Sequence, residues 1–178
     1  MTHAVVGMTL GSLAPLTRRW PFWLASAVLP MLPDLDVIGL TFGVRFLSMW
    51  GHRGISHSLL AALVLGAITA ALTRRALRVN PVALTLYFAV VTASHGVLDA
   101  LTNGGPGVAF FAPFDATRYF FPWRPIPVSP LAANFFSERG WHVFRAELLL
   151  VWIPSLVVTA IAYARRSRRP HRTRSQRR

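Results

Sequence analysis

The chain has 178 residues, 53% of them hydrophobic, and its mean hydropathy of +0.45 exceeds that of a soluble domain of this size. Its formal net charge of +13 comes from 19 basic residues, all of them arginine, against 6 acidic ones. The absence of cysteine excludes disulfide bonds and thiolate metal sites. These properties predict an integral-membrane protein.

Five hydrophobic segments follow one another along the chain, and we expect them to form an all-α membrane bundle. The first is short for a membrane span. The fourth opens with Pro81, a residue suited to the first turn of a helix, and at ~1.5 Å per residue it can cross a hydrocarbon core of ~30 Å. The segments are residues 1–16, 21–32, 55–72, 81–101 and 147–164, with a mixed connection at 37–50 and a long loop rich in Pro, Gly and aromatic residues at 102–145.

Arginines lie at the ends of these segments, and they predict how the bundle is oriented. If five segments alternate in direction, all of these arginines fall on one side, which the positive-inside rule places in the cytoplasm. Arginines in the long loop oppose this orientation, but long loops are weak topology signals. We therefore expect a multi-pass protein of the inner (plasma) membrane with a cytoplasmic C-terminus. The arginines concerned are Arg18 and Arg19, then Arg74, Arg75 and Arg78, and finally those from Arg165 onward.

The last fourteen residues contain eight arginines. A basic tail after a hydrophobic helix is typical of an anchor to anionic lipid, and this placement disfavours a nucleic-acid-binding arm. We divide the chain into a membrane-embedded domain, residues 1–164, and a disordered cytoplasmic tail, residues 165–178.

Three short clusters rich in His and Asp lie at the ends of hydrophobic segments, at residues 32–36, 50–58 and 94–99. An aspartate at the centre of a spanning helix costs ~2.5–3.5 kcal/mol, so such groups are usually paired, metal-bound or functional. The alternation that collects the arginines on one side brings these clusters together at the opposite, outward end. The groups predicted to meet there are His3, Asp34, Asp36, His52, His57, His95 and Asp99.

Spacing within two of the clusters suggests how the groups point. His95 and Asp99 are four residues apart on a helix, hence on one face, where they can share a metal ion or form a purely structural pair. Asp34 and Asp36 follow Pro33, where we expect the second segment to stop. In extended backbone both carboxylates point the same way and repel each other unless a cation or a proton lies between them; the alternative is a simple helix-stopping turn.

The middle cluster combines a glycine-rich loop with the start of a helix. His52 and His57 are five residues apart and cannot share a helix face, so we place His52 in the loop and His57 in the first turn beyond it. Ser56 is expected to cap that helix, whose positive end would then favour an anion at the site. Arg53 is either a substrate-binding fork for the same anion or an interfacial lipid contact.

Histidine and carboxylate ligands without cysteine suit zinc, manganese or iron. Seven candidate groups are more than one ion needs, so one or two ions are expected. A two-metal hydrolytic centre, in which an activated water attacks the substrate and a carboxylate takes its proton, uses this number naturally.

At these residues the chain resembles the YdjM-type family of inner-membrane-associated metal-dependent hydrolases. The resemblance covers most of residues 1–130 and also includes the loop from Ala112 to Arg118. It implies a membrane-bound hydrolase, and it implies metal ligation by His3, Asp36, His52, His57, His95 and Asp99, with Asp99 a candidate bridge and Asp34 a general base or outer-shell group. The matching motifs are Thr2-His3 with Gly7, LPDLD at 32–36, HRGISHS at 52–58, and HGVLD at 95–99 continuing to residue 105.

More distantly, the His-x-x-x-Asp helix and the order of acid before histidine are similar to zinc-dependent phospholipase C and its single-strand nuclease relatives, which are helical phosphodiesterases with several zinc ions. Those enzymes have a further His-x-x-x-Glu/Asp helix. Here His142 is followed at that spacing by Ala146, which puts a third metal ion in doubt.

The long loop contains ten aromatic residues between 110 and 141. Aromatic side chains beside a membrane usually lie at the headgroup level, and the loop could also form a lid that admits an amphiphilic or anionic small molecule from the outer leaflet. We expect membrane lipid as a partner.

Three other functions compete with the hydrolase. A metal-ion or proton transporter would need polar groups at several depths, whereas here they gather at one end. A bis-histidine haem protein would need facing histidines without adjoining acids. The third alternative is a non-catalytic membrane scaffold, with which the sequence is also consistent.

Overall fold

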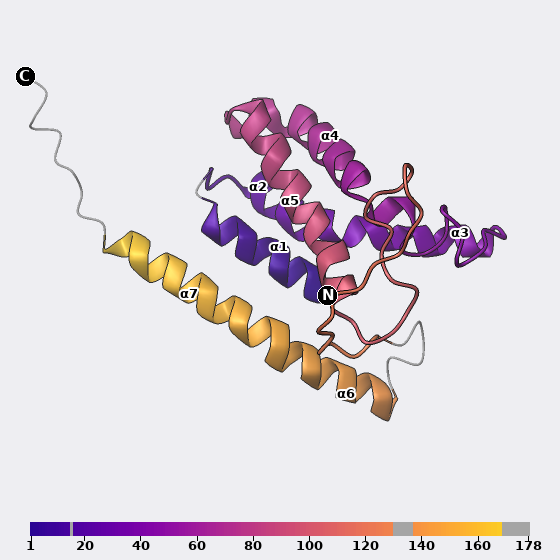
Figure 1. Cartoon of the computed structure of the whole chain (residues 1–178). Helices are drawn as coiled ribbons and strands as arrows, with labels where there is room; N and C mark the ends of the chain where they lie inside the picture. Colours follow the sequence, from indigo (N-terminus) through magenta and orange to yellow (C-terminus); the bar gives the residue numbers. More distant parts are fainter. Residues whose placement is uncertain (15, 130–136, 169–178) are drawn as a thin grey trace, which may run out of the picture.

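The computed structural model describes residues 1–14, 16–129 and 137–168 (Figure 1). Its described residues form helices and two isolated β-bridges, Thr102 with Ile126 and Val108 with Tyr119, and no strand. The helices are α1 (Thr2–Leu13), α2 (Trp20–Val28), η1 (Leu29–Asp36), α3 (Val37–Thr41), η2 (Ile55–His57), α4 (Leu59–Leu77), α5 (Pro81–Ala100), α6 (Glu138–Glu147), η4 (Leu148–Trp152) and α7 (Ile153–Ser167).

Four helical stretches are long and apolar enough to cross a membrane: Trp20–Thr41, Leu59–Leu77, Pro81–Ala100 and Glu138–Ser167. The all-α integral-membrane bundle predicted from the sequence is therefore confirmed. The first hydrophobic segment forms α1, which at 12 residues is shorter than the ~20 that a spanning helix needs.

The second segment does not stop at its prolines. Residues Leu29–Asp36 form a 3₁₀ helix that contains Pro30 and Pro33, and α3 extends it to Thr41. Neither proline has an N–H to donate to the carbonyl of residue i−4, and the segment that contains them winds as the tighter 3₁₀ helix instead of an α-helix. The predicted connection at residues 37–50 therefore begins only at Phe42, and the two aspartates lie within a helical stretch instead of after its end.

The last helix begins earlier than predicted. Ser137 caps α6 by accepting a hydrogen bond from the Gly140 amide (3.3 Å), so the end of the predicted loop is helical. A π-helical stretch, η4, joins α6 to α7. The polar α6 has no long apolar run, which is why its hydropathy did not indicate a helix. Part of the loop, residues 130–136, and most of the expected tail, residues 169–178, lie outside the described residues.

The helices α4 and α5 form the closest antiparallel pair. Arg78 ends α4 in a left-handed conformation (φ 56°), and Asn80 caps α5 by accepting hydrogen bonds from two backbone amides, followed by Pro81 in the first turn as expected. Midway along the pair, a Cβ atom on Gly66 would lie 2.6 Å from the Ala89 backbone nitrogen. The two backbones can therefore approach this closely only because residue 66 has no side chain.

Replacing Gly66 by Leu is expected to lower the free energy of unfolding by about 1–3 kcal/mol, because the new side chain must push α5 away. The matched control is Ala67→Leu, which adds the same side chain on the neighbouring, exposed position and should change stability by about 0.5 kcal/mol or less. Thermal unfolding of both variants in detergent measures the difference. Equal stabilities would show that this contact does not hold the pair together.

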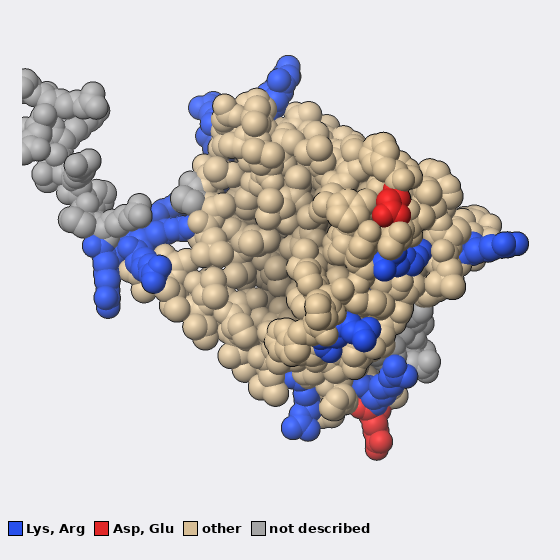
Figure 2. All heavy atoms as spheres, viewed as in Figure 1, with Lys and Arg blue, Asp and Glu red and all other residues tan. Residues whose placement is uncertain are grey.

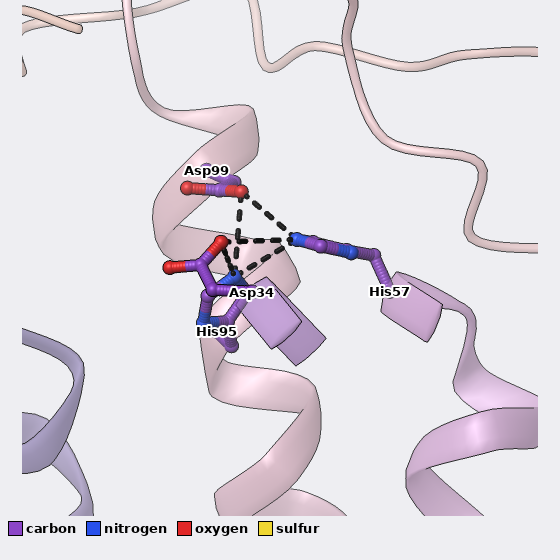
Figure 3. A group of neighbouring side chains, drawn as sticks. All are labelled: Asp34, His57, His95 and Asp99. Atoms are coloured by element: carbon purple, nitrogen blue, oxygen red, sulfur yellow. Dashed lines mark hydrogen bonds and ion pairs between the residues drawn. The ribbon is translucent and has the colours of Figure 1, made fainter. Parts of the chain in front are cut away.

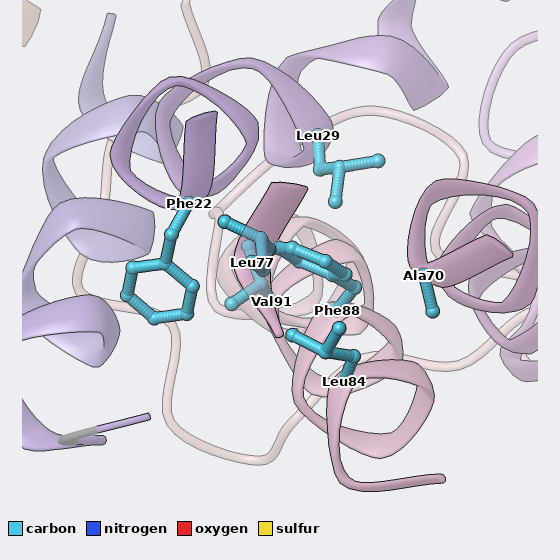
Figure 4. Packing of buried hydrophobic residues seen from close by; sticks show 7 residues of the cluster. All are labelled: Phe22, Leu29, Ala70, Leu77, Leu84, Phe88 and Val91. Atoms are coloured by element: carbon cyan, nitrogen blue, oxygen red, sulfur yellow. The ribbon is translucent and has the colours of Figure 1, made fainter. Parts of the chain in front are cut away.

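Seven buried apolar residues pack where α2 and η1 meet α4 and α5 (Figure 4). They form an apolar core in the middle of the bundle, between the arginine-rich end and the end that carries the His and Asp clusters. The residues are Phe22, Leu29, Ala70, Leu77, Leu84, Phe88 and Val91.

The long helix made by α6, η4 and α7 runs alongside α1 (Figure 1). Polar contacts join the two: Thr2 bonds Glu147 and accepts from the Trp152 indole (2.9 Å), and Ser12 bonds Thr159 (3.3 Å). Side-chain hydrogen bonds are a usual means of holding helices together in a bilayer, where apolar packing gains little.

The arginine-rich ends of the helices meet, as the alternation predicts. Arg19 donates to the carbonyl of Ala76 at the end of α4, and Arg166 donates to the carbonyl of Ser12 at the end of α1. Figure 2 shows a broad uncharged band between charged side chains at the two ends of the molecule. The start of α1 and the end of α5 lie at the end opposite these arginines (Figure 1).

Candidate metal centre

Three parts of the chain bring histidines and aspartates to the end of the bundle opposite Arg19 and Arg166. Asp34 comes from η1, His57 from η2, and His95 and Asp99 from the last turns of α5 (Figure 3). Among the described residues two groups could hold a metal ion: Asp34, His57, His95 and Asp99 form the first, and Asp36, His52 and His57 form the second.

The first group has the spacing of a four-coordinate site. His57 Nε2 and His95 Nε2 are 2.9 Å apart, and Asp99 Oδ2 lies 3.4 and 3.5 Å from them. Asp34 Oδ1 lies 3.7 Å from His57 Nε2 and 3.3 Å from His95 Nε2. A tetrahedral zinc ion with bonds of ~2.0–2.1 Å separates its ligand atoms by about 3.3–3.4 Å. The donor atoms therefore stand close to the positions that one tetrahedral ion requires.

Both imidazoles of this group are oriented through their other nitrogen. His95 Nδ1 lies 2.7 Å from the carbonyl oxygen of Pro30, and His57 Nδ1 lies 3.2 Å from Asp36 Oδ2. With Nδ1–H as the donor to these acceptors, each Nε2 presents a lone pair to the centre of the group. Carbonyl or carboxylate partners of this kind fix metal-binding histidines in many proteins.

The second group is held together by direct hydrogen bonds. His52 Nδ1 lies 2.9 Å from Asp36 Oδ1, while Asp36 Oδ2 accepts from the Arg53 amide (3.2 Å) and the Ser56 hydroxyl (2.6 Å). An ion placed here would have to displace some of these donors. The geometry therefore favours one ion in the first group, with Asp36 orienting His57.

Asp34 and Asp36 do not point the same way, contrary to the prediction from extended backbone. In the 3₁₀ helix they diverge, so that Asp34 faces His57 Nε2 and Asp36 faces His57 Nδ1 (3.7 and 3.2 Å). The repulsion expected between adjacent carboxylates is thereby relieved, and one imidazole lies between them.

Burial alone would lower the pKa of the His57 imidazole, but hydrogen bonds with Asp34, Asp36 and Asp99 outweigh it and raise that pKa to about 10. A proton held this firmly balances the surrounding carboxylates. A metal ion bound at Nε2 would replace it, since metal ligands must be deprotonated.

Arg53 is buried and supports the aspartate of α5. Its Nε lies 3.0 Å from Asp99 Oδ2, and its Nη1 donates to the Thr102 hydroxyl and the Gly104 carbonyl oxygen (both 3.1 Å). These contacts join the 51–54 loop to the end of α5. That Arg53 also binds substrate remains a prediction.

His3 lies beside the first group but belongs to neither. Its ring stacks on His95 with centroids 3.9 Å apart, and its Nδ1 is buried with no hydrogen-bond partner. The structure thus brings His3 to the predicted end of the bundle, against a face of His95.

A pocket of about 460 Å³ opens on one side of the first group. Asp34 and Asp99 line it, together with His3, His52 and Arg53, whereas His57 and His95 do not. The side chain of Asp34 is 47% exposed, compared with 9% for Asp99 and 0% for each histidine. The volume of the pocket is within the usual range for small-molecule sites. Of the four side chains in the first group, Asp34 is the most accessible from the pocket.

The predicted cap at Ser56 is wrong. Ser58 caps α4 by accepting from the Ala61 amide (3.0 Å), while the Ser56 hydroxyl is used by Asp36. The Leu59 amide donates to the Phe110 carbonyl oxygen (3.0 Å). Because these first amides of α4 have protein acceptors, the anion site expected at this helix start has no support.

No role was predicted for Arg118, yet this residue holds the site loop in place. Its Nη1 donates to the carbonyl oxygens of His52, Arg53 and Gly107 at 3.1–3.3 Å, and its Nη2 donates to that of Ser48 (3.0 Å). One arginine in an aromatic loop carries no periodic signal, so only the folded loop reveals these acceptors.

A family model described as "YdjM inner membrane protein" matches residues 1–168. The chain belongs to this family. The inner membrane protein YbcI of Escherichia coli strain K12 is 36% identical over 171 residues, which cover 93% of this chain and 97% of YbcI. No solved structure matches the chain significantly. Membership of the YdjM family confirms the resemblance in the motifs and, with the four apolar helices, a multi-pass protein of the inner membrane.

Proposed function

We propose that this YdjM-family protein is a membrane-bound, metal-dependent hydrolase that acts on a phosphoester or another lipid-linked ester. The observation that carries the proposal is the convergence of four donor atoms at tetrahedral spacing, with the most exposed donor, Asp34, lining a pocket. A closed structural site would bury all four ligands. Here His57, His95 and Asp99 are buried and Asp34 is accessible, so with the three buried donors as ligands the fourth position beside Asp34 would be left to water or substrate.

Zinc suits this set of nitrogen and oxygen donors, and when bound it would lower the pKa of a coordinated water and polarise the ester. His57, His95 and Asp99 would hold the ion. Asp34 would accept a proton from the attacking water, whose oxygen bonds to the phosphorus or acyl carbon while the ester bond to the leaving oxygen breaks. That proton then passes to the leaving oxygen, which gives one acid and one alcohol for each water consumed.

The described structure favours a hydrolase over the two other site-based functions. A transporter needs a polar path, but Phe22, Phe88 and Val91 are fully buried in an apolar core below the cluster. A haem protein needs an iron between its two axial histidines, but His57 Nε2 and His95 Nε2 are only 2.9 Å apart with two carboxylates beside them.

The test is metal analysis of the purified full chain, with hydrolysis of phosphodiester and lipid ester probes measured before and after chelation. We expect about one zinc per chain and hydrolysis that disappears with the chelator and returns with zinc. Metal-free protein that binds no added zinc would overturn the metal site. Zinc binding without hydrolysis of any probe would favour the scaffold.

We also propose that the cluster faces the periplasm and the C-terminus the cytoplasm, as the positive-inside rule indicates. The chain contains no cysteine, so a single introduced cysteine is the only residue of the protein that a thiol reagent can label. Ala116→Cys, on the exposed loop near the cluster, should react with a membrane-impermeant maleimide in spheroplasts. Ala76→Cys, exposed at the arginine-rich end, should react only after the membrane is permeabilised. The reverse pattern would invert the orientation.

A further inference from the structure

A second, apolar pocket adjoins the one that reaches the metal centre. It has a volume of about 250 Å³ and shares Leu98 and Ile126 with the first pocket. Its remaining lining comes from α1, the end of α5, the segment before Ile126, η4 and α7. It includes Leu101 directly after α5, Trp123, Leu150 of η4 and Val158 of α7.

Polar side chains at the first pocket give way to apolar ones at the second over residues 98–102, at the end of α5. Asp99 and Thr102 line the first pocket and Leu101 lines the second, while Leu98 lines both. The polar surface therefore begins within one helical turn of the apolar surface. A ligand that fills both pockets must be amphiphilic, with its polar head at the cluster and an apolar part beyond Leu98.

The apolar pocket lies at the level of the spanning helices. Its lining includes Leu98 of the span Pro81–Ala100 and Val158 of the span Glu138–Ser167. At its rim Leu150 is 43%, Val158 38% and Trp123 70% exposed. With both helices crossing the bilayer, these exposed side chains would face lipid, and we therefore expect the pocket to open toward hydrocarbon.

Polar contacts hold η4 and α7 against α1, from Thr2 with Trp152 to Ser12 with Thr159. In the described residues α7 makes its main helix contacts with α1 and η4, and α5 pairs chiefly with α4. The side of α5 that carries Leu98 is therefore left facing the second pocket.

We propose that the substrate of this site is a phosphorylated amphiphile, whose hydrocarbon chain lies in the second pocket and whose phosphate lies at the metal centre. A divalent ion beside the buried Arg53 would favour an anionic head. The reaction at that head rests on the proposed function, whereas the position of the chain rests on the two adjoining pockets. Such a substrate would enter from the bilayer between α5 and α7.

The test uses the full chain in lipid nanodiscs and dodecyl phosphate with a photoreactive diazirine near the end of its chain. Irradiation should label residues 98–101 and 150–158, and excess dodecyl phosphate should compete while ethyl phosphate should not. Leu101→Trp should fill the pocket and lower this labelling by about tenfold. The matched control is Leu86→Trp, on the exposed lipid-facing side of α5, which should leave labelling unchanged. Zinc content should be the same in both variants.

Labelling spread over lipid-facing residues and insensitive to Leu101→Trp would overturn the inference, whether or not the protein hydrolyses anything. Hydrolysis is followed separately with dodecyl and ethyl p-nitrophenyl phosphate. Leu101→Trp should lower kcat/KM for the dodecyl ester by about tenfold and leave the ethyl ester within about twofold. Specific labelling without hydrolysis of either ester would support the inference and contradict the proposed reaction; equal loss for both esters would contradict the inference.

Discussion

Asp99→Asn is expected to lower the affinity for zinc by about 100-fold or more, because changes to outer partners of a metal already cost about 10- to 100-fold and Asp99 is proposed to bind the ion directly. The amide keeps the size of the side chain but removes its negative charge. Zinc content after dialysis against a zinc buffer, determined by mass spectrometry, measures the change. The control is Asp115→Asn, the same substitution at an exposed carboxylate outside the cluster.

The same substitution also leaves the buried Arg53 without its ionic partner, and breaking a buried pair costs about 3–5 kcal/mol. Loss of zinc therefore needs to be separated from loss of fold. His95→Gln keeps the pair of Arg53 with Asp99 and removes one proposed ligand, so it should lose zinc with less destabilisation. Far-UV circular dichroism and gel filtration follow the fold. Full zinc content in both variants would exclude these residues as ligands.

Asp34→Asn is expected to lower kcat for hydrolysis by about 10²- to 10⁴-fold, the usual contribution of a general base, while most of the zinc is kept. The reason for this separation is burial: the side chain of Asp34 is 47% exposed, whereas that of Asp99 is 9% exposed and those of His57 and His95 are 0% exposed. If Asp34→Asn loses as much zinc as Asp99→Asn, Asp34 is a zinc ligand that contributes as much to binding as Asp99. Unchanged kcat would remove it from the reaction.

The alternation of segments was enough to predict which groups meet. Arginines in the short connections identified one end of the bundle, which placed the histidines and aspartates at the opposite end. The structure brings six of these residues into two groups there. This inference depended only on segment number and charge. It needed no knowledge of side-chain direction.

Side-chain direction was where the sequence failed. Asp34 and Asp36 diverge because prolines wind their segment into a 3₁₀ helix, whereas a proline-rich stretch read along the sequence suggests a break. Ser56 and Ser58 both fit a cap, and only the partner of Ser56, Asp36, decides between them. These choices depend on contacts between residues distant in sequence, which no local pattern records.

The candidate ligands Asp34, His57, His95 and Asp99 all come from the first hundred residues, and none comes from α6, η4 or α7. The C-terminal helix contributes walls to both pockets instead, through Glu147 in one and Leu150 to Val158 in the other. Under the proposed function, substitutions in this helix would therefore change which compounds the pockets accept and leave the four donor side chains in place. Metal binding and selectivity for the ligand would then be encoded in different parts of the chain, and one could be altered without the other.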